Sequence, residues 1–125
     1  MPLTFAAFCA HKQGLYQRYV TLRVGSPARA CRLVQVTLGD LAMNWHEVLS
    51  SSSPAAESWQ LLTARVAEAA GRTLRAPYDV LSRQDADVLV LRYRMGLPLG
   101  VAADLMGLDE STLTCRLHAA LRTFR

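Results

Sequence analysis

The chain has 125 residues, of which 51% are hydrophobic and 19% charged, and its formal net charge is +4. This length allows one compact domain or two very small ones, which excludes a large enzyme, and the apolar fraction excludes a largely disordered chain. Of the 14 basic residues all but Lys12 are arginine, and this mild basic excess permits a nucleic-acid partner without requiring one.

Apolar residues at helical spacing predict a first helix over residues 4–23 that ends at Gly25. Its predicted inner face carries Phe5, Phe8, Leu15, Tyr19 and Leu22. Ser26-Pro27 starts a second helix that runs to about Leu49, because serine caps helices well and proline suits the first helical position. The apolar face of this second helix carries Val34, Leu38, Leu41 and Trp45.

Ser53-Pro54 repeats the same start signal for a third helix, which ends at Gly71. Its apolar face carries Trp59, Leu62 and Val66. Residues 71–80 contain glycine, proline and polar residues, so we interpret them as a short connector. The three helices before the connector predict a small bundle around their aromatic side chains.

Beyond the connector, Ser82 is predicted to cap a fourth helix. Its inner face carries Ala86, Leu89, Val90 and Tyr93. Gly96 and Pro98 predict a turn, residues 99–106 a short fifth helix, and Gly107 a second turn. Asp109 then caps a sixth helix. The inward side chains of the sixth helix are Leu113, Leu117, Leu121 and Phe124.

Residues 98–125 are typical of a helix-turn-helix. The motif needs a small residue where the helices cross, a glycine in the turn and an apolar anchor early in the second helix, and Ala103, Gly107 and Leu113 supply these. In such a motif the second helix enters the major groove of DNA. The predicted base-edge contacts are Glu110, Ser111, Thr112, Thr114, Cys115 and His118, and the predicted phosphate contacts are Arg116, Arg122 and Arg125. The alternative is a helical hairpin that packs without binding DNA.

The same half of the chain resembles the C-terminal domain of bacterial RNA polymerase sigma factors. Residues 81–93, LSRQDADVLVLRY, resemble the helix that opens that domain. Residues 105–113 and 116–121 resemble its helix-turn-helix. The Arg116-Leu117-His118 sequence, followed by Ala-Leu, is typical of the extracytoplasmic-function (ECF) type.

The first half of the chain is similar to the core-binding domain of the same family. Residues 5–22 resemble its opening helix, residues 25–28 and 33–35 its polymerase-docking helix, and residues 58–62 the start of its promoter-melting helix. The resemblance implies an all-α protein. It would have a three-helix core-binding-like domain at 1–70, a connector at 71–80 and a three-helix helix-turn-helix domain at 81–125.

The chain departs from the family at the docking helix. The family carries acidic residues around the Leu-Val-Gln of that helix, whereas this chain has Arg29, Cys31, Arg32 and Val36. Arginine in place of an acid turns attraction to a basic polymerase surface into repulsion. We therefore expect a changed protein-binding surface formed by Arg29, Arg32, Gln35 and Val36. Residues 63–70 also lack an aromatic side chain that could stack on a flipped base, and the connector is short.

Three functions follow from these features as alternatives. The first is a sigma-like transcription regulator that contacts promoter DNA through the helix-turn-helix. The second is a minimal ECF sigma factor that binds core RNA polymerase. The third is a pseudo-sigma interaction module that binds another sigma-like or an anti-sigma protein and no DNA.

Several classes of function lack any sequence signal. No run of about 18 apolar residues occurs, so we expect no membrane partner, and the N-terminal residues lack the pattern of a signal peptide. The three cysteines are far apart in the sequence, which favours reduced thiols in the cytoplasm. Motifs for phosphate loops, zinc proteases and nucleophile elbows do not occur. We expect a cytoplasmic protein that is not an enzyme and has no metal, cofactor or small-molecule substrate.

Overall fold

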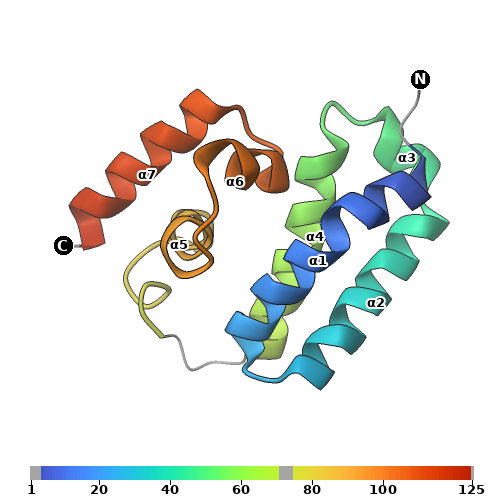
Figure 1. Ribbon diagram of the computed structural model, residues 1–125, viewed down its shortest axis with the longest axis horizontal. Coiled ribbons are helices and arrows are strands. Elements are labelled where there is room, and N and C mark those ends of the chain that lie inside the picture. Colours follow the sequence, from blue (N-terminus) through green and yellow to red (C-terminus); the bar gives the residue numbers. More distant parts are fainter. Residues whose placement is uncertain (1–3, 71–74, 125) are drawn as a thin grey trace. The chain divides into compact units, whose positions relative to one another are not determined.

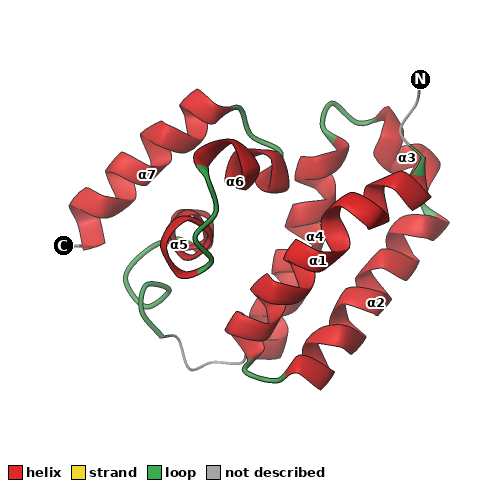
Figure 2. Cartoon of the chain, in the orientation of Figure 1, coloured by secondary structure: helices red, strands yellow, loops and turns green. Residues whose placement is uncertain are grey.

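The computed structural model describes residues 4–70 and 75–124, which form seven α-helices and one π-helical turn, with no strand in these ranges (Figure 1, Figure 2). The predicted all-α class is confirmed. The chain divides into two compact units, Met1–Ala70 (unit 1) and Gly71–Arg125 (unit 2). No helix in the described ranges is long and apolar enough to cross a membrane.

Unit 1 begins with two helices whose ends match the sequence signals. Helix α1 (Phe5–Val24) starts at Thr4, whose side-chain oxygen accepts a hydrogen bond from the Ala7 amide at 3.1 Å. It ends at Gly25, which has φ of 75°, a left-handed conformation that a residue with a Cβ adopts at a cost. Helix α2 (Pro27–Met43) starts at Ser26, whose Oγ accepts from the Arg29 amide at 3.2 Å.

The predicted second helix is interrupted at Asn44, so its predicted extent to Leu49 is wrong. Helix α2 ends at Met43, and a separate short helix, α3 (Trp45–Ser50), follows. Asn44 has non-helical φ and ψ of −116° and 19°, and its side-chain amide donates to the Asp40 carbonyl at 3.1 Å. Asparagine competes in this way with the helical hydrogen-bond pattern. Trp45 is therefore half-buried on α3, with its ring 5.0 Å from the Phe8 ring.

Helix α4 (Pro54–Ala70) completes unit 1 and starts at Ser53, whose Oγ accepts from the Ala56 amide at 3.2 Å. Helix α1 packs against both α2 and α4 (Figure 1). Their shared core is aromatic, because the Trp59 ring lies 4.7 Å from the Tyr19 ring and 6.0 Å from the Tyr16 ring. The predicted faces of α2 and α4 are confirmed by the burial of Val34, Leu38, Leu41, Trp59, Leu62 and Val66.

The inner face of α1 differs from the prediction. Leu22 was expected inside but is 42% exposed, whereas Tyr16 is fully buried. The buried face follows the four-residue spacing of Phe8, Lys12, Tyr16 and Val20. A row of residues four apart winds around the helix axis in the opposite sense to a row of residues seven apart. The buried face therefore diverges from the row that joins Phe8 to Leu22, and Leu22 lies at its edge.

Unit 2 contains α5 (Arg83–Leu89), the π-helical turn η1 (Val90–Arg94), α6 (Leu99–Met106) and α7 (Glu110–Phe124). Ser82 caps α5 as predicted, with its Oγ accepting from the Asp85 amide at 3.3 Å. Helix α7 packs against α5 and α6. The core is mainly aliphatic, and its fully buried members include Val88, Val90, Leu91, Leu105 and Leu113.

The π-helical turn explains why the prediction for Tyr93 is wrong. In η1 the Met95 amide donates to the Val90 carbonyl at 3.0 Å, five residues back instead of four. A π-helical turn is wider than an α-helical turn, so the side chains within it point in other directions than α-helical spacing predicts. Leu91 is consequently buried, while Tyr93, which was expected in the core, is 57% exposed. Phe124 was also expected inside and is 43% exposed, because it lies in the last turn of α7, beyond the buried Ala120.

The predicted connector falls partly outside the described residues, since 71–74, and Gly71 with them, are not described. Residues 76–80 form consecutive turns. The Tyr78 hydroxyl donates to Oδ1 of Asp87 at 2.5 Å, and Asp87 is only 1% exposed. This hydrogen bond attaches the turns to α5, so the second half of the connector is folded onto unit 2.

Candidate nucleic-acid and partner surfaces

Helices α6 and α7 are joined by a tight turn at Gly107. Gly107 has φ of 73°, and the Leu108 amide donates to the Ala103 carbonyl at 2.9 Å. Ala103 is 3% exposed and Leu113 is fully buried. The small residue, the turn glycine and the apolar anchor therefore occupy the structural positions that the sequence predicts for them.

Asp109 fixes the first turn of α7. Its Oδ1 accepts hydrogen bonds from the Thr112 amide at 2.7 Å and from the Ser111 hydroxyl at 3.1 Å. The hydrogen bonds from Thr112, and then that from Ser111, hold the pKa of Asp109 below its ordinary value. Asp109 is therefore a carboxylate at neutral pH, and its charge complements the positive end of the α7 dipole.

The predicted DNA-contacting residues do not all share one face of α7. Ser111, Cys115, His118 and Arg122 follow one another at intervals of four, three and four residues, and all four are exposed. At 3.6 residues per turn this spacing places them on one stripe, opposite the face that buries Leu113 and Ala120. We call Ser111, Cys115, His118 and Arg122 the outer stripe.

The other predicted contacts lie beside the outer stripe. Glu110 is exposed, and its backbone carbonyl accepts from the half-buried Thr114 hydroxyl at 2.8 Å. Thr112 and Arg116 lie on the opposite flank, where Nη1 of Arg116 is 3.7 Å from Oδ1 of Asp85 on α5. Arg116 is therefore engaged with α5, and Arg125 lies outside the described residues.

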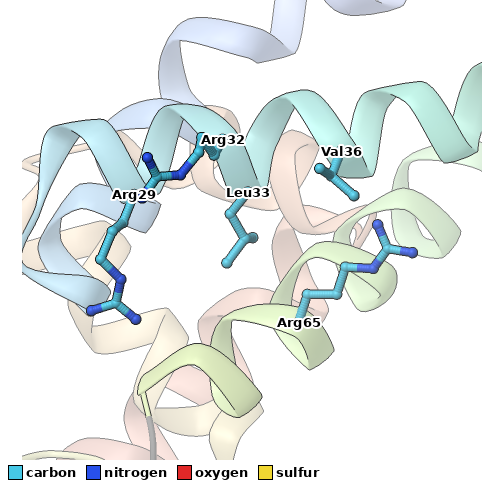
Figure 3. A pocket seen from close by; sticks show the side chains of 5 residues that line it. All are labelled: Arg29, Arg32, Leu33, Val36 and Arg65. Atoms are coloured by element: carbon cyan, nitrogen blue, oxygen red, sulfur yellow. The ribbon is translucent and has the colours of Figure 1, made fainter.

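A basic surface occupies the exposed side of α2. Arg29, Arg32, Gln35 and Val36 are all exposed, and Val36 reaches 58%. A shallow groove of about 290 Å³ runs between α2 and α4 beside them (Figure 3). Its lining residues are Arg29, Arg32, Leu33, Val36 and Arg65.

Two of the arginines at this groove connect the helices of unit 1. Nη2 of Arg29 donates to the Ala69 carbonyl in the last turn of α4 at 3.1 Å, and Arg65 of α4 pairs with Asp40 of α2. In the view of Figure 3, Leu33 points into the space between these two arginines, and Arg32 extends along α2 toward Arg29. The sequence did not predict Leu33 and Arg65 as part of this surface. Arg65 joins it only through the packing of α4 on α2, for which the local sequence holds no signal.

The described residues offer no cluster suited to a metal ion. No three histidine, cysteine, aspartate or glutamate side chains in residues 4–70 and 75–124 lie close enough to bind one. The three cysteines are free thiols, exposed at Cys31 and Cys115 and half-buried at Cys9. Burial raises the pKa of the Cys9 thiol, which lowers its reactivity at neutral pH.

Comparison of the chain with protein-family models, with curated proteins and with solved structures gave no match. The function of the chain is therefore inferred from its own residues and their geometry.

Proposed function

We propose that this protein is a sigma-like transcription regulator that contacts promoter DNA through α7 of unit 2. The outer stripe is the observation that carries the proposal, because it presents polar side chains and a cation on the face of α7 that unit 2 leaves uncovered. The second helix of a helix-turn-helix contacts base edges with such a face. The resemblance of both halves of the chain to sigma factors supports the same function in transcription initiation.

The residues of α7 have different roles in this proposal. Ser111, Cys115 and His118 face base edges in the major groove, and Arg122 contacts a phosphate further along the helix. Arg116 reaches a phosphate only by leaving Asp85. An ion pair between partly exposed side chains is worth about 0–1 kcal/mol, so one phosphate contact compensates for its loss. Arg125 is retained as a predicted phosphate contact.

The experiment begins by selecting binding sites from a random duplex library with the purified full chain. Binding of the selected duplex is then measured by fluorescence anisotropy over a series of salt concentrations. Arg122→Ala is expected to weaken binding to all sequences about equally and to lower the slope of log K against log salt by about one. His118→Ala is expected to relax preference at one base pair, with a change of about 1–3 kcal/mol in discrimination.

Arg18→Ala is the matched control, because it removes the same charge from an exposed site on α1. If Arg122→Ala and Arg18→Ala change the affinity and the salt slope equally, α7 is not the DNA-contacting helix. If the selection yields no enriched duplex and the chain shows no salt-dependent binding, the DNA function itself is wrong.

The exposed basic surface of α2 favours a second candidate, a pseudo-sigma interaction module. Arg32 and Val36 place a cation beside an exposed apolar side chain, a combination that suits an acidic protein partner. Purification of the tagged chain from its own cells tests this candidate. A stoichiometric protein complex that is lost in Arg32→Glu supports the module, whereas co-purified core RNA polymerase and promoter-specific transcription support a minimal sigma factor.

A further inference from the structure

Unit 2 contains an apolar pocket that the helix-turn-helix does not use. Its volume is about 560 Å³, within the range of about 300–1,000 Å³ that is usual for small-molecule sites. Three segments form its walls: the turns in the second half of the connector, the α5–η1 junction and the last turns of α7. The lining residues are Ala76, Pro77, Leu89, Val90, Tyr93, Arg94, Leu121 and Phe124.

The pocket accounts for the two exposed aromatic side chains of unit 2. In unit 2, Tyr93 and Phe124 are the two residues that the helical pattern places in the core and that the fold exposes. Both line the pocket. Tyr93 belongs to η1, the π-helical turn that follows α5, and its side chain lines this wall. An apolar ligand would cover aromatic surface that is otherwise in contact with water.

The wall formed by Ala76 and Pro77 is held in place by a buried hydrogen bond. Tyr78, the next residue, donates from its hydroxyl to the carboxylate of Asp87, which is buried in α5. A hydrogen bond to a buried carboxylate is strong, and its loss leaves the charge without that donor. This wall is therefore held in place without a ligand, which reduces the entropic cost of ordering it on binding.

The charge of the lining selects the ligand class. Among the described residues that line the pocket, Arg94 alone is charged, and its side chain is exposed. A guanidinium group beside an apolar cavity suits a molecule with an apolar body and a carboxylate group. We propose that this pocket binds a small amphipathic carboxylate, an alkyl chain with a single anionic end, as a ligand of unit 2.

Decanoate is the probe for the test, and decan-1-ol and decyltrimethylammonium have the same chain length with a neutral and a cationic end. Calorimetric titration of the full chain is expected to show one saturable site, with decanoate bound most tightly. Between octanoate and decanoate, each added CH₂ is expected to lower the Kd about fourfold. Amide shifts in NMR spectra are expected to be confined to the residues around Tyr93 and Phe124.

Two variants and a control locate the site. Arg94→Gln is expected to weaken decanoate by up to about fivefold and to leave decan-1-ol unchanged. Phe124→Ser is expected to weaken both ligands, and because Phe124 is exposed the fold should persist, as checked by circular dichroism. Arg83→Gln removes an equal charge from an exposed site outside the pocket and is expected to change neither affinity.

Three results would overturn the proposal. One is the absence of saturable decanoate binding by the folded chain. A second is equal affinity for decanoate and decan-1-ol in both the original protein and Arg94→Gln. The third is concentration-dependent self-association that Phe124→Ser abolishes, which would make the pocket an interface between two copies. Arg122 does not line the pocket, so these results are independent of the DNA-binding experiment.

Discussion

The two units use their aromatic side chains differently. In unit 1, Phe8, Tyr16, Tyr19 and Trp59 are at most 4% exposed, and their rings contact one another in the centre of the helical bundle. In unit 2 the core consists of leucine, valine, alanine and methionine, and Tyr93 and Phe124 lie at the surface. Both units are all-helical and carry a similar fraction of apolar residues, so the difference lies in where the large rings are placed.

The placement of the rings gives them different roles, in stability in unit 1 and in binding in unit 2. A buried aromatic side chain removes a large apolar area from water, and each ring pair adds about 0.5–1.5 kcal/mol beyond that area. Both the buried area and the ring pairs stabilise unit 1. Unit 2 brings its helices together with small residues such as Ala103 and Ala120, and it leaves aromatic surface for ligands. We therefore expect truncation of a ring to destabilise unit 1 and to affect binding in unit 2.

Trp59→Ala should have the largest effect on stability, because Trp59 contacts two tyrosine rings in the core of unit 1. The expected loss is about 3–5 kcal/mol in the free energy of unfolding. Hydrogen exchange read by mass spectrometry should show lost protection across α1, α2 and α4. Trp45→Ala is the matched control at a half-buried position and should cost less. Equal losses in the two variants would contradict the idea of an aromatic core centred on Trp59.

Leu113→Ala and Phe124→Ala test the comparison inside unit 2. Leu113 is fully buried between α7 and its neighbours, so its truncation should cost about 2–5 kcal/mol. Phe124 is the larger side chain, yet its exposure should limit the cost to about 1 kcal/mol. Urea unfolding followed by circular dichroism measures both. A greater loss in Phe124→Ala would mean that its ring belongs to the core after all.

The helix boundaries were predictable wherever a residue type determines the backbone locally. Ser26, Ser82 and Asp109 cap helices as expected, because a short polar side chain reaches the backbone amide three residues ahead. Gly25 and Gly107 end helices because they adopt positive φ. These features depend on a few neighbouring atoms, so the sequence alone predicts them.

The errors arise where the register of a helix depends on packing. The π-helical turn at Val90–Arg94 has no local signal in the sequence, and it moved Tyr93 from the expected core to the pocket. The predicted contacts on α7 were identified by residue type, whereas helical spacing separates the outer stripe from Arg116, and the packing of α7 brings Arg116 to Asp85. The groove on unit 1 likewise required the position of Arg65 relative to α2.

Gly14→Ala and Gly107→Ala should change the stability of the two units in opposite directions. Gly14 lies in α1 and a Cβ there would meet no atom within 4 Å, so alanine should stabilise unit 1 by about 0.5–1 kcal/mol. Gly107 has φ of 73°, so alanine should destabilise unit 2 by about 1–2 kcal/mol. Hydrogen exchange assigns each change to a unit. Destabilisation of α1 by Gly14→Ala would contradict its placement in an open position.

The smallest expected effect is a pH dependence confined to unit 2. The pKa of Asp109 is lowered in the folded chain by hydrogen bonds from Thr112 and Ser111, so the carboxylate form favours folding. Its contribution is fully present above the unfolded pKa of about 3.8 and is lost as the pH falls through the lower folded value. Asp109→Asn keeps an acceptor oxygen at the cap but does not titrate in this range.

The difference in unfolding midpoint between the original protein and Asp109→Asn isolates this one group, because every other acid titrates in both proteins. In urea unfolding, the original protein should have the higher midpoint at pH 6, and the difference between the two midpoints should be smaller at pH 3. Hydrogen exchange at the two pH values should show a change in the protection of α7 and none in that of α1. A difference that stays constant with pH would show that the cap acts through its hydrogen bonds alone, without a contribution from charge at the start of α7.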